Sequence, residues 1–507
     1  MAAFGVHFGN SSACLAVFKD GKTDVVANDL GDRTTPAMVA YTELEQAVGM
    51  AAKQAYIRNA QNTVPCVKKI LGRAMDDPEV QSYKETYAVK VVPHKGEPHF
   101  QVEFKEKTTL ISPGTVAEAV FKTMMGIAKS HGDGDIHDSV LTVPTDFTEE
   151  QISAISDAAA SSGFNILRLI KEPLAALMAY DIGQVDNKAE SYTLVFRLGG
   201  ESSSVSVVKV SNGLYRILGS VNSKQLSGSK FTKALADHLA AEFFRQYKLD
   251  VKESRRSVSK LNVAAERCKH TLSNLGNASC AVDSLFEGVD FHNSVSRARL
   301  ENQVGFLMQQ CTSLIDAACG EAEISTDKID KVIVCGGGAK MPLVQKTIQD
   351  YIKSAEVLSS IPPDEVIAIG SAKQAGILTG CDTAEIKENT GDNEIECLSK
   401  AVCLRSSSDG ETKLVSVFPS LTPLPSRKHE TVVLGEHQTS LQMDLCECDD
   451  LQQPDTAADL AKLVMRDLPE AAKVLVTFHL RREGSLHVTC REEKSNKTES
   501  VVVEVCS

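Results

Sequence analysis

Two stretches of the sequence pair short apolar runs with a glycine bend and small hydroxyl residues, a combination that could hold phosphate. Residues 192–210 (YTLVFRLGGESSSVSVVKV) place Gly199 and Gly200 between two β-type runs. Residues 4–18 (FGVHFGNSSACLAVF) repeat this pattern around Gly9. Glycine lets a ligand approach the bare backbone, and amides in such a turn can face phosphate oxygens. Two facing copies could therefore hold one polyphosphate between them, although each stretch alone also suits an ordinary β-hairpin.

A third glycine turn, in residues 332–342 (VIVCGGGAKMP), ends a buried-type strand and precedes apolar residues at helical spacing. The first amides of a helix have no intrahelical partner, so such a turn favours an anion or the polar edge of a ligand. The sequence contains no GxxxxGKS or GxxxxGKT motif, and no GxGxxG follows a strand. A Walker-type or dinucleotide-binding loop is therefore excluded.

The elements that position these turns follow the same alternation twice. Residues 1 to about 190 begin with the first hairpin, and helical patterns follow near 113–130 and 148–162. From about 191 to 380 the second hairpin is again followed by helical patterns, at 231–247 and 258–273. Strands that alternate with helices predict an α/β domain, and the repeated hairpin predicts duplicated lobes. Small residues within 370–376 predict a helix that packs closely against a neighbour.

Two further regions follow the α/β part. Residues 381–399 (CDTAEIKENTGDNEIECLS) are polar and acidic, which is typical of a linker. Residues 400–507 contain short β-type runs separated by proline and glycine turns: AVCLR, LVSVF, HETVVL, SLQMDLC, KVLVTFHL, SLHVTC and SVVVEV. This pattern predicts a β-sandwich. No long amphipathic helix follows these runs, so we expect a sandwich without a helical lid.

The composition narrows the classes of function. The chain has 507 residues, enough for several domains, and a formal net charge of −13. An acidic chain is poorly steered towards nucleic acid, so we expect no direct nucleic-acid partner. No apolar run reaches the roughly 18 residues of a membrane span, and no secretory signal is apparent, so we expect no membrane association. The 14 cysteines are scattered without a CxxC pair, which indicates reduced thiols in the cytosol.

Several segments resemble the 70-kDa heat-shock chaperone family. The resemblance covers nearly the whole chain and rests on NDLGDRTTPAMVAY, VKKILGR, LTVPTDFTEEQ, GFNILRLIKEPLAALMAY, VIVCGGGAKMPLVQ and IPPDEVIAIGSAKQAGIL. The segments VSRARLEN, FEGVDF and FPSLTPLP resemble a short, atypical, ribosome-associated member of that family. The resemblance implies a duplicated actin-like ATPase domain over residues 1–380, with lobes at about 1–190 and 191–380, and a small all-β sandwich domain over 400–507.

The resemblance also implies an ATP site between the two lobes. Lys68 matches the lysine that reaches the γ-phosphate, and Glu172 matches a glutamate near the metal and the attacking water. The nucleotide-binding residues expected from the match are Asn10, Ser11, Lys68, Gly199, Gly200, Glu201, Ser202, Gly228, Glu266, Lys269, Ser273, Gly336, Gly337, Gly338, Lys340 and Asp364. The expected cofactor is ATP, or ADP in its place.

Departures from the family pattern bear on catalysis. His7 and Arg197 stand where the family has aspartates that hold hydrated Mg²⁺ and orient the attacking water. Losing one positioned acid or base typically slows a reaction about 10²–10⁴-fold, so we expect weak hydrolysis or none, and no firm Mg²⁺ site. Glu201 replaces a glycine and places negative charge near the phosphates. Arg197 could point inward and pair with a phosphate in place of the metal, or could turn outward.

These features predict a cytosolic chaperone subunit that binds ATP, hydrolyses little or none, and acts with a J-domain co-chaperone at the ribosome on nascent polypeptides. The linker favours this interpretation, because it has only Ile395 and Leu398 where ATP-coupled members of the family carry a leucine-rich segment. A conventional ATP-hydrolysing chaperone, a small-molecule kinase and a scaffold without a ligand are the alternatives. The β-sandwich could bind extended chains by strand addition, or hold a partner.

Overall fold

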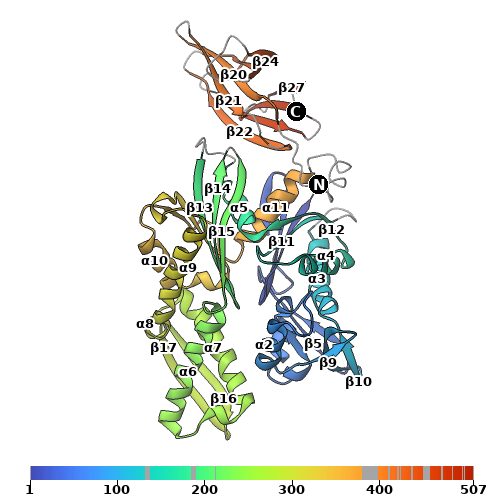
Figure 1. The fold of residues 1–507 in the computed structure, drawn as a ribbon, viewed down its shortest axis with the longest axis vertical. Helices are drawn as coiled ribbons and strands as arrows, with labels where there is room; N and C mark the ends of the chain where they lie inside the picture. The colour runs from blue at the N-terminus through green and yellow to red at the C-terminus, as the bar shows by residue number, and fades with distance from the viewer. Residues whose placement is uncertain are drawn as a thin grey trace. The chain divides into compact units, whose positions relative to one another are not determined.

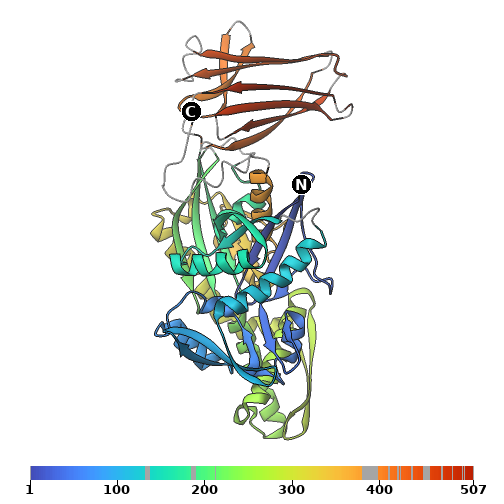
Figure 2. The same ribbon diagram turned by 90° about the vertical axis from the view of Figure 1, so that its right-hand side faces the viewer.

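The computed structural model describes residues 2–131, 137–183, 190–211, 213–379, 398–408, 411–419, 422, 424–435, 438–448, 457–469, 472–481, 484–493, 495 and 497–505. Contacts divide the chain into two compact units, drawn from two sides in Figures 1 and 2. The first unit contains Met1–Tyr180, Tyr192–Val208 and Ile217–Ile377, and the second contains Asp181–Ser191, Lys209–Arg216 and Leu378–Ser507. No helix among the described residues is long and apolar enough to cross a membrane.

The first lobe of the α/β unit is built on a sheet with the strand order β12-β11-β1-β2-β3. Strands β1 and β2 form an antiparallel hairpin, and β1 pairs in parallel with β11. Every residue of β1 except His7 is buried, and Phe8 contacts the ring of Phe121 in α3. The bounds are β1 (Ala3–Phe8), β2 (Ser12–Lys19), β3 (Lys22–Val25), β11 (His137–Val143), β12 (Phe164–Lys171), α3 (Pro113–Lys129), α4 (Glu149–Ser161) and α5 (Glu172–Ala179).

Local signals set where the helices of this lobe begin. Thr148 and Gln151 form a capping box at the start of α4, and Ser112 caps α3 ahead of Pro113. The remaining elements of the lobe are β4 (Thr35–Pro36), β5 (Met38–Tyr41), β6 (Gln46–Val48), α1 (Met50–Ala55), η1 (Ala60–Asn62), β7 (Thr63–Pro65), η2 (Val67–Lys69), α2 (Pro78–Thr86), β8 (Lys90–His94), β9 (Glu97–Phe104) and β10 (Lys107–Ile111).

The second lobe repeats the topology of the first. Its sheet has the order β15-β14-β13-β18-β19, so the hairpin strands again lie beside a strand, β18, that pairs in parallel with the first of them. The bounds are β13 (Glu190–Leu198), β14 (Ser203–Ser211), β15 (Leu214–Ser223), α6 (Gly228–Tyr247), η3 (Val251–Glu253), α7 (Arg255–Asn274), β16 (Asn277–Phe286), β17 (Val289–Ser296), α8 (Arg297–Val304), η4 (Gly305–Leu307), α9 (Met308–Glu321), η5 (Thr326–Lys328), β18 (Lys331–Cys335), η6 (Gly337–Lys340), α10 (Pro342–Tyr351), β19 (Glu356–Leu358) and α11 (Val366–Thr379). The predicted duplication and the predicted actin-like α/β class are confirmed.

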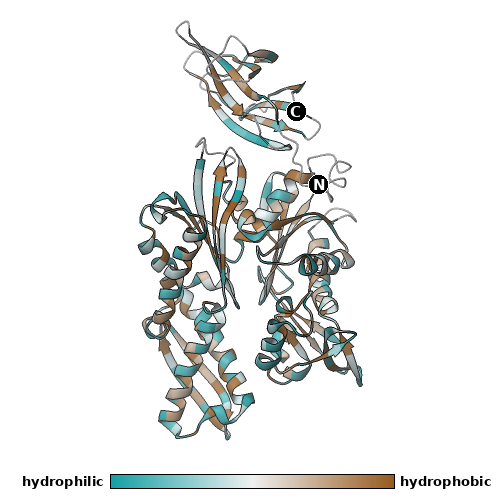
Figure 3. Ribbon diagram, viewed as in Figure 1, coloured by the Kyte–Doolittle hydropathy of each residue, from teal (hydrophilic) through white to brown (hydrophobic). Residues whose placement is uncertain are grey.

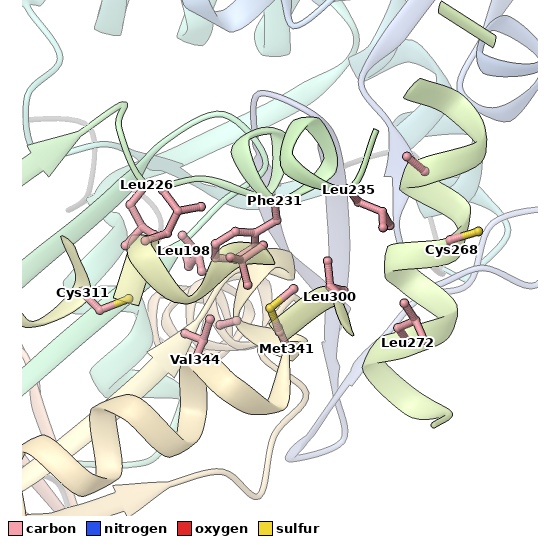
Figure 4. Packing of buried hydrophobic residues seen from close by; sticks show 14 of the residues in the cluster. Leu198, Leu226, Phe231, Leu235, Cys268, Leu272, Leu300, Cys311, Met341 and Val344 are labelled. Carbon is pink, nitrogen blue, oxygen red and sulfur yellow. The ribbon is translucent and has the colours of Figure 1, made fainter. Parts of the chain in front are cut away.

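The core of the second lobe fixes the end of β13. Leu198, the last residue of that strand, is fully buried and lies close to Phe231 of α6 in the apolar cluster of Figure 4. Figure 3 shows hydrophilic and hydrophobic residues alternating along α6 and α7, as amphipathic helices at a surface require. The glycine turn that follows Leu198 is therefore attached to a packed core rather than to a free loop.

Helix α11 crosses the first lobe through the small residues that the sequence indicates. A Cβ added at Gly370 would lie 1.7 Å from the carbonyl oxygen of Ala175 in α5. A Cβ added at Gly5 of β1 would lie 2.1 Å from the amide nitrogen of Ala372. The prediction of a closely packed helix over 370–376 is confirmed, and Figure 1 shows α5 and α11 side by side.

The second unit contains a sandwich of two four-stranded sheets, in the orders β21-β20-β23-β24 and β22-β25-β26-β27. Alternate residues of β25, including Val474, Val476 and Phe478, are buried in its core. The bounds are β20 (Ala401–Ser408), β21 (Glu411–Phe418), β22 (Ser426–Val433), β23 (Leu441–Cys448), β24 (Ala458–Met465), β25 (Lys473–Leu480), β26 (Ser485–Glu492) and β27 (Thr498–Glu504). The predicted all-β sandwich is confirmed.

One strand of the second unit differs from the sequence prediction. The strand β24 was not among the predicted runs, because its sequence ADLAKLVM is rich in good helix formers. Most of the predicted linker, including Ile395, lies outside the described residues. Leu398, at its end, is fully buried in the core of the sandwich, and its amide donates to Thr422 O at 2.9 Å.

Replacing Gly370 by alanine should destabilise the α/β unit, because the added methyl group collides with the backbone of α5. We expect a loss of about 1–3 kcal/mol in the free energy of unfolding, seen as a lower midpoint in urea or thermal unfolding. The matched control is Gly126→Ala in α3, where a Cβ would meet no atom within 4 Å. That change should be neutral or stabilise by up to about 1 kcal/mol, since alanine is the better helix former. Equal midpoints for the two variants would contradict the close packing.

Candidate functional site

The glycine turns of the two hairpins lie against each other. A Cβ added at Gly200 would lie 2.2 Å from Ser11 Oγ, so the backbone of the second turn contacts the first directly. Equivalent hydrogen bonds close the two turns, because the amides of Gly9 and Gly199 each donate, at 2.9 Å, to the carbonyl oxygen three residues ahead. The structure therefore brings the two turns together, as the sequence predicts.

Amide groups on both turns are left without a backbone acceptor. Within the described residues, no carbonyl accepts a hydrogen bond from the amides of Asn10, Ser11, Gly200 or Glu201. The side-chain oxygen Oδ1 of Asn10 is also buried without a partner among the described residues. Amides exposed on facing turns form a site for anions, and a buried polar atom without a partner is unusual outside functional sites. These residues fit a chain of phosphate groups.

Two further glycine regions pack on the second hairpin. The amide of Gly228, at the start of α6, donates to Gly199 O at 2.9 Å. A Cβ added at Gly336 would lie 2.4 Å from Leu198 O, and one added at Gly338 would lie 3.2 Å from Gly199 O. The glycine regions named from the sequence thus converge on Gly199, which the sequence pattern alone does not indicate.

Helix α7 closes one side of this site. Lys269 Nζ donates to Gly228 O at 2.9 Å and to Thr232 Oγ1 at 2.8 Å. Burial lowers the pKa of Lys269 to about 8. Glu266 forms an ion pair at 3.1 Å with Lys53 of α1, so the two lobes are bridged by side chains beside α7. The sequence indicates Lys269 and Glu266, but not Lys53.

The other residues expected at the nucleoside differ in whether their polar groups already have hydrogen-bond partners. Ser273 Oγ donates to Lys269 O of its own helix at 3.1 Å. Lys340 Nζ donates to Asp364 Oδ2 at 2.6 Å, while Asp364 Oδ1 is buried with no partner in the described part of the chain. A Cβ added at Gly337 would meet no atom within 4 Å, so the backbone there faces open space. These groups could receive the polar edges of a nucleoside.

Glu172 lies at the start of α5, and its carboxylate holds one cation from each lobe. Oε1 lies 3.1 Å from Lys68 Nζ, and Oε2 lies 2.6 Å from Arg197 Nε. The side chains of Lys68 and Glu172 are only 2% and 4% exposed. Burial by itself raises the pKa of Glu172, but Arg197 and Lys68 outweigh it and hold that pKa well below its ordinary value. Glu172 is therefore an ionised carboxylate that faces two positive charges.

Arg197 follows the first sequence alternative in its direction, but it has a protein partner that neither alternative includes. It points inward, but it pairs with Glu172 at a geometry closer to a charge contact than to a straight hydrogen bond. Its Nη1 lies over the second glycine turn, where a Cβ added at Gly199 would be 2.8 Å away. The Nε edge of the guanidinium thus faces Glu172, and Nη1 lies beside the backbone of Gly199, in the turn that would hold phosphate.

His7 occupies the matching position in the first hairpin as a neutral ring. Its Nδ1 lies 2.9 Å from Thr142 Oγ1 and 4.0 Å from Glu172 Oε1. Burial lowers the pKa of His7 to about 4, with Glu172 opposing the shift and Lys68 adding to it. The imidazole therefore carries no charge at neutral pH, and it is tied to β11 through Thr142.

The residues present do not fit a divalent cation. Over the described ranges, no group of three His, Cys, Asp or Glu side chains is arranged to hold a metal ion. Glu172 is the carboxylate of the cluster, and both of its oxygens face cations that a Mg²⁺ ion would have to displace. We therefore assign no metal ligand and derive no step through Mg²⁺.

Glu201 has a partner that sequence reasoning missed. Its Oε2 lies 3.4 Å from Nζ of Lys69, which also lies over the ring of Tyr87. The two side chains are 18% and 15% exposed, so this ion pair between the lobes is largely shielded from solvent. The adjacent lysines of VKKILGR thus serve different carboxylates, Lys68 serving Glu172 and Lys69 serving Glu201.

The neutral, buried His7 predicts a pH dependence of stability. The unfolded chain gains a proton at His7 near pH 6.5, whereas the folded chain gains it only near pH 4. Stability should therefore fall as the pH drops through this window, by about 3 kcal/mol from His7 alone. His7→Asn, which cannot titrate, should flatten this part of the curve in urea unfolding, while His292→Asn on the exposed side of β17 should not. An unchanged slope in His7→Asn would contradict the shift.

Comparisons with known proteins agree with this architecture. The "Hsp70 protein" family matches residues 3–507 of the chain. Heat shock 70 kDa protein 14 of Danio rerio is 45% identical over 511 residues, covering 100% of this chain and 99% of that protein. The proteins of the same name from Mus musculus and Homo sapiens are 44% and 42% identical, and 100% of each chain is covered. A match over nearly every residue, together with the duplicated α/β lobes and the sandwich, shows that the chain belongs to the Hsp70 family of chaperones.

Proposed function

We propose that this chain is an atypical, adenine-nucleotide-binding chaperone subunit of the cytosol. It binds ATP, or ADP in its place, and hydrolyses little or none. It acts with a J-domain co-chaperone at the ribosome to keep nascent polypeptides competent to fold, without contacting nucleic acid or membrane itself. The single observation behind this proposal is that Lys68 and Arg197 neutralise Glu172 beside glycine turns suited to phosphate.

Nucleotide binding is supported by groups that have no hydrogen-bond partner in the part of the chain that the structure describes. The amides of Gly200 and Glu201 and those of the adjacent first turn have no backbone acceptor within the described residues, and such amides suit phosphate oxygens. The Nη1 edge of Arg197 lies at the same turn and can supply positive charge there without a metal. At the other end, the unpartnered oxygen of Asp364 and the open backbone at Gly337 suit a nucleoside.

Weak hydrolysis follows from the state of the two groups that could position water. Phosphoryl transfer depends on orienting the attacking water and on balancing the charge that develops. The carboxylate of Glu172 is held by two cations, and the Nδ1 atom of His7 is engaged with Thr142. Both groups are poor bases towards a water molecule. Burial lowers the pKa of His7 to about 4, whereas Arg197 and Lys68 outweigh burial and lower the pKa of Glu172. Each such loss is worth about 10²–10⁴-fold in rate.

A conventional ATP-hydrolysing chaperone remains the second candidate, because Lys68 and Glu172 are retained. The contact between Lys68 Nζ and Glu172 Oε1 at 3.1 Å is the observation that favours this second candidate. Single-turnover hydrolysis separates the two candidates, since a rate equal to that of a conventional Hsp70 protein would require an active base that the proposed function lacks.

Affinity for ATP should not depend on Mg²⁺. In isothermal titration, the dissociation constants measured with Mg²⁺ and with EDTA should agree within about threefold. A tenfold difference would correspond to about 1.4 kcal/mol of binding free energy. The double variant His7→Asp, Arg197→Asp should gain a requirement for Mg²⁺ of about tenfold or more, because carboxylates then face the phosphates.

The matched control for that double variant is His292→Asp, Arg256→Asp, which makes the same charge change at exposed positions of the second lobe. It should leave the affinity independent of metal. A steep Mg²⁺ requirement in the unaltered chain would contradict the replacement of metal by Arg197.

A stable J-domain partner is expected in cell extracts. Tagged full-length chain, purified gently at physiological salt, should elute with a J-domain protein at a mass well above its own 54.6 kDa. The complex should survive apyrase treatment, since an uncoupled subunit has no nucleotide-driven release step. Elution as a monomer at every salt concentration would count against the proposed role.

A further inference from the structure

Glu201 is an acidic residue in the second glycine turn, directly after Gly200. Its amide is among those without a backbone acceptor within the described residues, and its carboxylate reaches across to Lys69 of the first lobe at 3.4 Å. The side chain is only 18% exposed, so solvent shields its charge poorly. A phosphate bound at the amide of Glu201 would lie close to the negative charge of the same residue's carboxylate.

Most charges around the turns are already engaged with a partner in the protein. Lys68 and Arg197 face Glu172, Lys69 faces Glu201, and Lys269 donates to Gly228 O and Thr232 Oγ1. His7 adds nothing at neutral pH, because burial lowers its pKa to about 4. Lys68 and Lys69 each have a carboxylate partner, so neither is a free counter-charge for a further phosphate.

We infer that Glu201, held by Lys69, makes this site select a nucleoside diphosphate over the corresponding triphosphate. The inference rests on the proposed nucleotide-binding function and specifies its ligand. A triphosphate brings one more negative charge than a diphosphate, and that charge enters a site with no metal ligand and with a carboxylate on its rim. The repulsion acts at short range in a shielded place, where Coulomb energies are larger than in water. The diphosphate avoids it.

The test is to measure ADP and ATP affinities by isothermal titration in EDTA for the full-length chain and for Glu201→Gln. The unaltered chain should bind ADP more tightly than ATP. Glu201→Gln should tighten ATP binding by about tenfold, which is the effect of about 1.4 kcal/mol of relieved repulsion, and should change ADP binding by about threefold or less. Lys69→Gln should act in the opposite sense and weaken ATP more than ADP.

Glu85→Gln is the matched control, because it removes the same charge from an exposed position of α2. It should change neither affinity. Thermal unfolding of each variant checks its fold, and Glu201→Gly offers a second, smaller replacement should Glu201→Gln unfold. An unaltered chain that prefers ATP, or a Glu201→Gln variant in which ADP and ATP shift equally, overturns the inference alone. Failure of the unaltered chain to bind either nucleotide overturns the proposed function and the inference with it.

Discussion

The buried carboxylate of Glu172, shared by Lys68 and Arg197, is the interaction on which the rest of the site depends. Placing these charges away from water is costly, and only their mutual attraction offsets that cost. The cations come from different lobes, so the cluster joins η2, α5 and the end of β13. An arginine in this part of β13 requires Glu172 to stay ionised, and both carboxylate oxygens of Glu172 then face cations rather than a metal site.

The charged cluster can exist because the surrounding backbones approach each other so closely. Gly200 lies against Ser11, Gly336 lies against Leu198, and α11 crosses α5 at Gly370. Each of these contacts leaves no space for a Cβ, so the positions of the turns are set by backbone rather than by adaptable side chains. A rigid frame of this kind holds Arg197 over the second turn with little loss of side-chain entropy on binding a ligand.

The sequence predicted those features that depend on local pattern. The two hairpins, the alternation of strands and helices, the small residues of α11 and the sandwich all follow from periods of two and 3.6 residues and from glycine placement. What it missed depends on tertiary context. Strand β24 has a helix-favouring sequence that pairing with β23 overrides. The partners of Arg197 and Glu201 come from the other lobe, and Lys69 is 132 residues away from Glu201, so no local pattern could assign them.

Positive charge supplied by side chains instead of a metal ion affects how the lobes could respond to cleavage of a nucleotide. A metal ion that binds with the nucleotide changes its coordination when the terminal phosphate is cleaved, and a cycling chaperone can convert that change into motion. Here the positive charge belongs to Lys68, Lys69 and Arg197, and it is present whether or not a nucleotide is bound. Two ion pairs between the lobes, at Glu172 and Glu201, already supply a bridge at this place. A ligand shifts a conformational equilibrium only by its differential affinity for the two states. A lobe arrangement held by the protein's own charges would leave little for nucleotide cleavage to change, which is the physical reason for proposing a subunit that hydrolyses little or no ATP.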